Sequence, residues 1–213
     1  MSLVTGIESR KGRGGAVNVF VDGQFAFAAS PDLMVEAGVH TGQELKPGEV
    51  EELKRRAAVC RAVDVSLAYL GARPRSESEV RQRLHRGKFD RATVEEAVGR
   101  LRAKGLIDDV AFARFWRESR DRFRPRSRRL LGIELRQRGL RAEEIAQALG
   151  DVDDEANARA AAVTKARSCT GLDYQAFRKR LAGFLRRRGF TFELVDKTID
   201  QVWRETAGSP PDL

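Results

Sequence analysis

The sequence predicts a mainly α-helical protein: three tandem three-helix repeats in an elongated array, preceded by a small N-terminal antiparallel β-hairpin or sheet. Three observations support this fold class. A set of apolar positions recurs three times at a nearly constant interval, helix-capping signals stand ahead of helical apolar spacing, and alternating apolar residues flank a turn signal near the N-terminus.

The recurring set has four apolar positions, spaced 5, 5 and 4 residues apart. The three copies are Leu84, Phe89, Val94 and Val98; Leu135, Leu140, Ile145 and Leu149; and Leu185, Phe190, Val195 and Ile199. Each copy contains a glycine that we expect to end one helix in a left-handed conformation. These glycines are Gly87, which is displaced by one position, Gly139 and Gly189. Repeats of this kind bury their apolar faces partly on their neighbours.

The first residues read as β-structure. Val17, Val19 and Val21 alternate along one strand, and Asp22–Gly23 supplies the two positions of a type I′ turn. Phe25 and Phe27 alternate on the returning strand, and Val4 and Ile7 indicate a third strand across the loop Lys11–Gly15. Ser30–Pro31 then predicts a capped short helix that ends at Gly38.

After residue 48 the pattern becomes helical. A 3-4 spacing predicts one buried face of a long helix, formed by Val50, Leu53, Ala57, Cys60, Leu67 and Leu70. Ser76–Glu79 predicts a capping box, and Thr93 with Glu96 predicts a second one. Asp108 is the expected N-cap of the middle repeat, Asp153–Asp154 begins the last repeat, and Asp173 begins its second helix.

Two aromatic stripes follow helical spacing, which is more typical of core packing than of base stacking. They are Phe112, Phe115 and Trp116 with Ser119, and Tyr174, Phe177 and Phe184 with Leu181. The expected boundaries are 1–48 for the N-terminal extension, 49–105, 106–152 and 153–206 for the repeats, and 207–213 for a disordered tail.

Composition argues against most enzyme classes. The 213 residues include only two histidines and two cysteines, and Cys60 and Cys169 have no metal-site spacing. Gly12–Gly15 lacks the lysine of a phosphate-binding loop. Asp108–Asp109 could be proposed as metal ligands, but helix capping accounts for Asp108 and no motif places a third carboxylate nearby. We therefore expect no catalytic residues, no metal and no cofactor. Without a membrane-spanning run or a signal-peptide core, we expect a cytoplasmic protein.

The formal charge of +9 indicates an anionic partner, and much of the positive excess lies in one stretch. Residues 114–141 contain eleven arginines and three acidic residues, and Arg186–Arg188 forms a smaller patch at a helix C-terminus. A solvated basic face is the alternative interpretation, and the helix dipole favours cations at the smaller patch in any case. The candidate partner-binding residues are Arg117, Arg120, Arg122, Arg124, Arg126, Arg128, Arg129, Arg136, Arg138, Arg186, Arg187 and Arg188.

Several segments resemble the RecX family of regulatory proteins. They are Ala68–Leu70 running into Arg73–Glu79, Gly105–Ala113 with its Leu-Ile-Asp-Asp-x-x-Phe-Ala run, Glu134–Leu140, and the hairpin Val19–Gly23. Arg126–Arg128 departs from the family pattern, in which many members have a glycine.

The resemblance implies a non-enzymatic regulator that binds the groove of a RecA–DNA filament and limits its growth, ATPase and strand exchange. The implied partners are the RecA recombinase filament and single-stranded or filament-bound DNA, and the protein is expected to be a monomer. From the residues alone, a direct DNA-binding helical module without a recombinase partner remains open.

Overall fold

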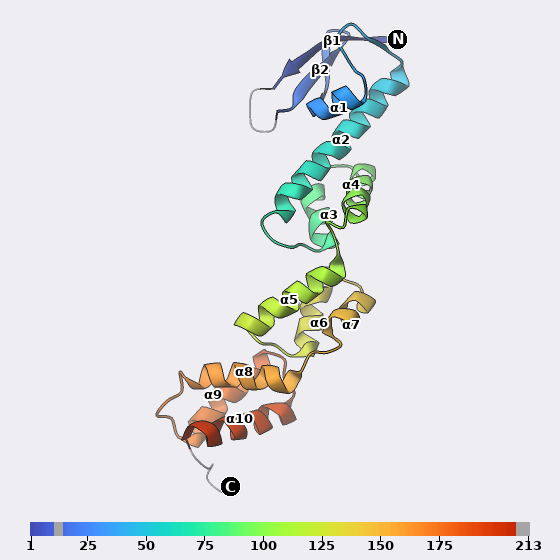
Figure 1. Cartoon of the computed structure of the whole chain (residues 1–213). Coiled ribbons are helices and arrows are strands. Elements are labelled where there is room, and N and C mark those ends of the chain that lie inside the picture. The colour runs from blue at the N-terminus through green and yellow to red at the C-terminus, as the bar shows by residue number, and fades with distance from the viewer. Residues whose placement is uncertain (11–14, 208–213) are drawn as a thin grey trace. The chain divides into compact units, whose positions relative to one another are not determined.

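The computed structural model describes residues 1–10 and 15–207, which divide into two compact units, 1–108 and 109–213. We describe each unit by itself (Figure 1). The first unit contains β1 (Ser2–Ser9), β2 (Val17–Val21), β3 (Gln24–Ala29), α1 (Pro31–Glu36), β4 (Glu44–Leu45), α2 (Pro47–Leu70), α3 (Glu77–Arg86) and α4 (Arg91–Ala103). The second contains α5 (Asp109–Phe123), α6 (Arg128–Arg136), α7 (Ala142–Leu149), α8 (Asp154–Ala166), α9 (Tyr174–Arg187) and α10 (Phe192–Ala207).

The N-terminal segment forms an antiparallel sheet in the order β3-β2-β1-β4. Asp22 and Gly23 both have positive φ, at 52° and 78°, as the predicted type I′ turn requires. The third strand is confirmed, and the two-residue strand β4 adds to the sheet beside β1. The Ser30 side chain accepts a hydrogen bond from the Leu33 amide and caps α1, which confirms the predicted short helix.

Helix α2 buries opposite faces along its length. Val50, Leu53 and Ala57 pack against the sheet core, whereas Val59 and Ala62 pack with α3 and α4. At about 100° per residue, these two sets are centred on opposite sides of the helix. The prediction of a single buried stripe is therefore wrong at Leu67, which is 42% exposed, while Cys60 and Leu70 are partly buried against different cores. The helix changes its buried face because it serves two different cores.

Helices α3 and α4 complete the first three-helix module with the C-terminal half of α2 (Figure 1). Ser76 caps α3 through the predicted box: its Oγ accepts from the Glu79 amide, and the Glu79 carboxylate accepts from the Ser76 amide. The second predicted box is wrong. Asp90 caps α4 by accepting from the amide and the hydroxyl of Thr93, which lies buried inside the first turn.

The left-handed residue shifts position in the first module. Gly139 and Gly189 adopt positive φ, at 83° and 89°, as predicted for the second and third modules. In the first module Gly87 has a φ of −74°, and Lys88 takes the left-handed conformation at 61°. Gly87 lies one residue before the position that needs the left-handed conformation. Lys88 occupies that position instead, although the conformation favours glycine.

The second unit contains two further three-helix modules, each with its own core (Figure 1). In the first of these modules Phe112, Leu131, Leu135 and Leu149 are buried between α5, α6 and α7. In the other module Phe177, Leu181, Leu185 and Ile199 are buried between α8, α9 and α10. Asp153 and Asp173 cap α8 and α9, as predicted. Ala207 ends α10, and the rest of the predicted tail, 208–213, lies outside the described residues.

Candidate polyanion-binding site

Two arginine patches that are far apart in the sequence meet within the second unit. The amide of Ser127 donates to the carbonyl oxygen of Arg188 over 3.0 Å. In return, Nη1 of Arg188 donates to the carbonyl oxygen of Pro125 over 2.9 Å. The segment between α5 and α6 therefore lies against the turn between α9 and α10. We call residues Arg124–Ser127 and Arg188 the basic junction.

Gly189 makes this close approach possible. A Cβ atom at Gly189 would lie 2.5 Å from Oγ of Ser127 and 2.7 Å from Cβ of Leu130. The φ of 89° at the same residue also disfavours any side chain. Two independent constraints thus require glycine where the two patches join.

Positive charge is concentrated at the basic junction. Burial is the largest cause that lowers the pKa of the Arg126 guanidinium, and repulsion from neighbouring guanidiniums lowers it further. Those neighbours are Arg120, Arg188, Arg124 and Arg138. The pKa of Arg188 is lowered in the same way, first by burial and then by Arg124. Because each of these groups raises the free energy of the others, an anion bound here would relieve repulsion that already exists.

The buried carboxylate of Glu134 neutralises part of this charge. It accepts a hydrogen bond from Nε1 of Trp116 at 2.7 Å and one from Nε of Arg120 at 3.0 Å, and it forms an ion pair with Arg126. The guanidiniums of Arg120 and Arg138 lie over the Trp116 ring, 4.2 and 3.5 Å from its centroid. Arg120, Arg126 and Arg138 thus link α5 with α6. Because these guanidiniums bind groups of the protein itself, they are less available to a partner.

Two more candidate arginines bind within the second unit. Arg117 donates to the carbonyl oxygen of Ala148 over 3.0 Å and pairs with Asp151. The guanidinium of Arg128 donates to the carbonyl oxygens of Gly150 and Val152, 3.1 and 2.7 Å away, just after α7 ends. Both side chains tie the end of α7 to its neighbours.

The remaining candidate arginines, except Arg188, point to solvent. They are exposed, and no salt bridge joins them to another residue in the described ranges 1–10 and 15–207. This set, which we call the free arginines, comprises Arg122, Arg124, Arg129, Arg136, Arg186 and Arg187.

Helix α9 carries further exposed cations that the sequence analysis missed. Lys179 and Arg180 lie seven residues before Arg186 and Arg187, so all four fall within an arc of about 120° on one side of α9. Arg178 next to them pairs with Asp196 and does not contribute free charge. The i, i+7 spacing of these cations was present in the sequence and would have revealed the stripe.

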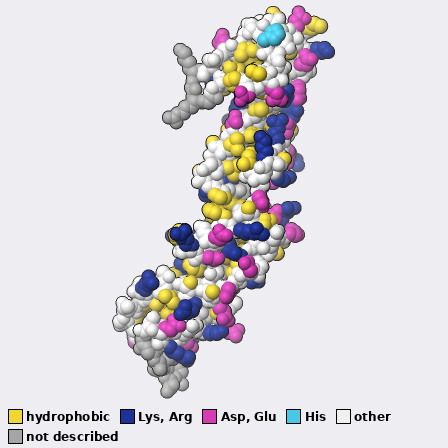
Figure 2. Space-filling model, viewed as in Figure 1, with side chains coloured by type: hydrophobic (Ala, Val, Ile, Leu, Met, Phe, Trp, Pro, Cys, Tyr) yellow, Lys and Arg dark blue, Asp and Glu magenta, His cyan; other side chains and the backbone are white. Residues whose placement is uncertain are grey.

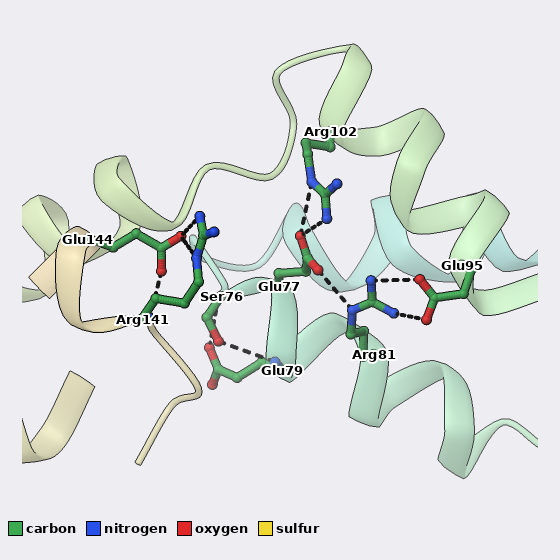
Figure 3. Close-up of polar contacts among 8 residues, drawn as sticks. All are labelled: Ser76, Glu77, Glu79, Arg81, Glu95, Arg102, Arg141 and Glu144. Carbon is green, nitrogen blue, oxygen red and sulfur yellow. Dashed lines mark hydrogen bonds and ion pairs between the residues drawn. The ribbon is translucent and has the colours of Figure 1, made fainter. Parts of the chain in front are cut away.

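Several arginines of the first unit pair with carboxylates on their own helix or on a neighbouring helix. Arg81 of α3 bridges Glu77 and Glu95, and Arg102 of α4 also binds Glu77 (Figure 3). Although burial alone would raise the pKa of Glu77, hydrogen bonds from Arg102 and Arg81 lower it. In the second unit, Figure 3 also shows Arg141 bound to Glu144 at the start of α7. On the face that Figure 2 shows, basic and acidic side chains are interspersed.

The described residues hold no group of three or more His, Cys, Asp and Glu side chains that could bind a metal ion. Among the same residues, no helix has both the length and the apolar character to cross a membrane.

Each of the three helical modules matches a model of a known protein family. Three family models match the three modules in order: "RecX, first three-helix domain" over residues 62–101, "RecX, second three-helix domain" over 108–149 and "RecX, third three-helix domain" over 153–199. The chain is thus a regulatory-type helical-repeat protein built from three three-helix domains.

Relatives named regulatory protein RecX cover most of the chain. One from Chlorobium phaeobacteroides is 36% identical over 144 residues, which are 68% of this chain and 95% of that protein. One from Lactobacillus gasseri is 29% identical over 205 residues, 95% of this chain and 75% of that protein. The chain belongs to the RecX family, which confirms the resemblance.

Two solved structures share the fold. A crystal structure of regulatory protein RecX aligns with a TM-score of 0.70 and 22% identity, and covers 94% of this chain and 100% of that chain. RecX from Lactobacillus salivarius aligns with a TM-score of 0.59 and 17% identity over 68% of this chain and 96% of that chain.

Proposed function

We propose that this protein binds the RecA recombinase–DNA filament and inhibits its growth, ATPase and strand exchange, and so modulates DNA repair and recombination. The observation that carries the proposal is the basic junction, where Arg188 contacts the segment Arg124–Ser127 and Glu134 is the one buried carboxylate among the described residues. Family membership supports the regulatory role, and the uncompensated charge supports a phosphate-bearing partner.

The proposed mode of action is non-enzymatic and needs no cofactor. Guanidiniums bind phosphate oxygens with paired N–H donors, and such contacts position a protein on nucleic acid without reading its sequence. A chain of separate modules offers several such contacts along an extended assembly. We propose a monomer that acts in the cytoplasm.

A charge-reversal variant tests the proposal. Arg124, Arg129, Arg186 and Arg187 are changed together to Glu, because these exposed side chains support no salt bridge within the described residues. We expect the concentration that half-inhibits the DNA-dependent ATPase of RecA to rise at least about tenfold, since each lost charge contact to phosphate weakens binding. Circular dichroism is expected to show unchanged helical content.

The matched control reverses four exposed cations of the first unit, Arg86, Lys88, Arg91 and Lys104, and so changes the net charge equally. It is expected to inhibit the ATPase within about twofold of the original protein. Equal inhibition by both variants would show that the free arginines are not the contact surface.

The exposed cations on α9 favour a second candidate function, direct DNA binding without a recombinase partner. This function predicts tight binding to naked DNA at the concentrations that inhibit RecA. If inhibition occurs well below the dissociation constant for naked DNA, the recombinase filament is the target.

A further inference from the structure

Helix α5 presents two phenylalanine side chains to solvent, one in the middle of the helix and one at the end that leads into the basic junction. Phe123, the last residue of α5, is 70% exposed, and Phe115 is 39% exposed. An exposed phenylalanine loses the favourable free energy of burying its ring, so two on one helix require an explanation. The sequence pattern had assigned Phe115 to a buried stripe, and the structure corrects that assignment.

The exposed rings are interleaved with cations. Arg122 lies seven residues after Phe115 and therefore almost in line with it along the helix. Its guanidinium lies 5.2 Å from the centroid of the Phe123 ring. Together Phe115, Arg122 and Phe123 fall within an arc of about 100° on α5. The exposed Arg124 follows directly.

The buried side of α5 is firmly fixed. Phe112 and Ala113 are buried against α6 and α7, and Trp116 and Arg120 are held by the Glu134 carboxylate. The helix therefore presents its outer side chains on a rigid support, which reduces the entropy lost when a ligand orders them.

We infer that the exposed side chains between Phe115 and Arg124 form a stacking platform for the bases of single-stranded nucleic acid, with Phe115 and Phe123 contacting bases and Arg122 and Arg124 contacting the backbone. Aromatic rings that alternate with cations are the side chains that bind single strands without sequence preference. Bases in a duplex are already stacked and cannot reach such rings, so this platform selects the single strand. The inference rests on the proposed function in its choice of a nucleic-acid partner.

The test compares two labelled oligonucleotides of equal length by fluorescence anisotropy: oligothymidylate and an abasic strand with the same phosphates. The full chain is expected to bind oligothymidylate at least about tenfold more tightly than the abasic strand, because only the first offers bases to stack. The double variant Phe115→Leu and Phe123→Leu keeps apolar bulk and removes the rings. We expect it to bind both strands equally, at the abasic affinity.

Phe25→Leu is the control, since Phe25 is 58% exposed on β3 in the first unit. It is expected to keep the tenfold preference. Equal binding of both strands by the unmodified chain, or an unchanged preference in the double variant, overturns the inference.

The ATPase assay separates this inference from the proposed function. If the double variant loses RecA inhibition but keeps its preference for bases, α5 contacts protein, and the stacking inference fails while the proposed function stands. If the unmodified chain shows the preference for bases without inhibiting RecA, the proposed function fails and the platform stands.

Discussion

At the scale of single residues, backbone conformation distinguishes glycines that look equivalent in the sequence. Gly105 and Gly189 both have positive φ, at 66° and 89°. A Cβ atom at Gly105 would meet nothing within 4 Å, whereas at Gly189 it would overlap Ser127 and Leu130. Gly105 is needed only for the backbone conformation of its turn. Gly189 is also needed for the close contact between two modules.

The substitutions Gly105→Ala and Gly189→Ala separate these two roles. We expect Gly105→Ala to lower the free energy of unfolding by about 1 kcal/mol, which is the cost of left-handed backbone for alanine. Gly189→Ala is expected to cost at least about 3 kcal/mol, because the overlap adds to that strain. Urea denaturation measures both values, and equal costs would contradict the close approach at the basic junction.

Lys88 offers the converse substitution. Because its φ is 61°, Lys88→Gly is expected to raise the free energy of unfolding by about 1 kcal/mol through relief of left-handed strain. Lys88→Ala keeps the strain and serves as the control, with a change below about 0.5 kcal/mol. A thermal melt in which the glycine variant is no more stable than the alanine variant would count against this backbone geometry.

At the scale of elements, the pairing of α5 with α6 depends on one buried carboxylate. Glu134 is 7% exposed and accepts from Trp116 and Arg120 on α5, while it also pairs with Arg126. Its charge offsets guanidiniums that would otherwise repel one another. The candidate site and the stability of this module therefore share the same residues.

We expect Glu134→Gln to destabilise the protein by about 2 kcal/mol, since it leaves the partly buried guanidiniums of Arg120 and Arg126 without a counter-charge. Glu143→Gln, on the exposed start of α7, is the control and is expected to change stability by less than about 0.5 kcal/mol. Trp116 fluorescence follows the loss locally, because the indole N–H donates to Glu134. A Glu134→Gln variant as stable as the control would show that the carboxylate does not hold α5 against α6.

Much of the element order was predictable because its signals are local. Ser30, Ser76, Asp153 and Asp173 cap helices as expected, since a capping side chain and its amide lie within three residues of each other. The prediction of a Thr93 cap is wrong because Asp90 accepts from the Thr93 amide and so begins the helix three residues earlier. The change of buried face along α2 was not predictable, because it depends on two separate cores.

At the scale of the whole molecule, the formal charge of +9 is not evenly available to a partner. Both units keep exposed cations, such as Arg86 and Arg91 in the first and the six free arginines in the second. Only in the second unit do contacts between distant segments bring two arginine patches together, among the described residues, so we expect affinity for a polyanion to depend mainly on that unit.

Salt dependence measures how many of these cations bind phosphate. If the six free arginines each neutralise one phosphate of a single strand, log K is expected to fall with log salt with a slope of about −4. The variant with Arg124, Arg129, Arg186 and Arg187 changed to Ala should reduce the slope to about −1.4, because two contacts remain. Anisotropy titrations at several salt concentrations give both slopes. The same slope for the variant and the original protein would show that these four side chains do not contact phosphate.

The sequence by itself determined the three helical modules, the N-terminal sheet and the basic character of residues 114–141, because periodicity, capping and composition act over short distances along the chain. Only the tertiary structure decided which arginines stay free. The Glu134 carboxylate pairs with Arg120 and Arg126, and Arg188 binds Pro125 across 63 residues. Charge pairing depends on which side chains folding brings together, so a count of arginines could locate the basic stretch but not the junction within it.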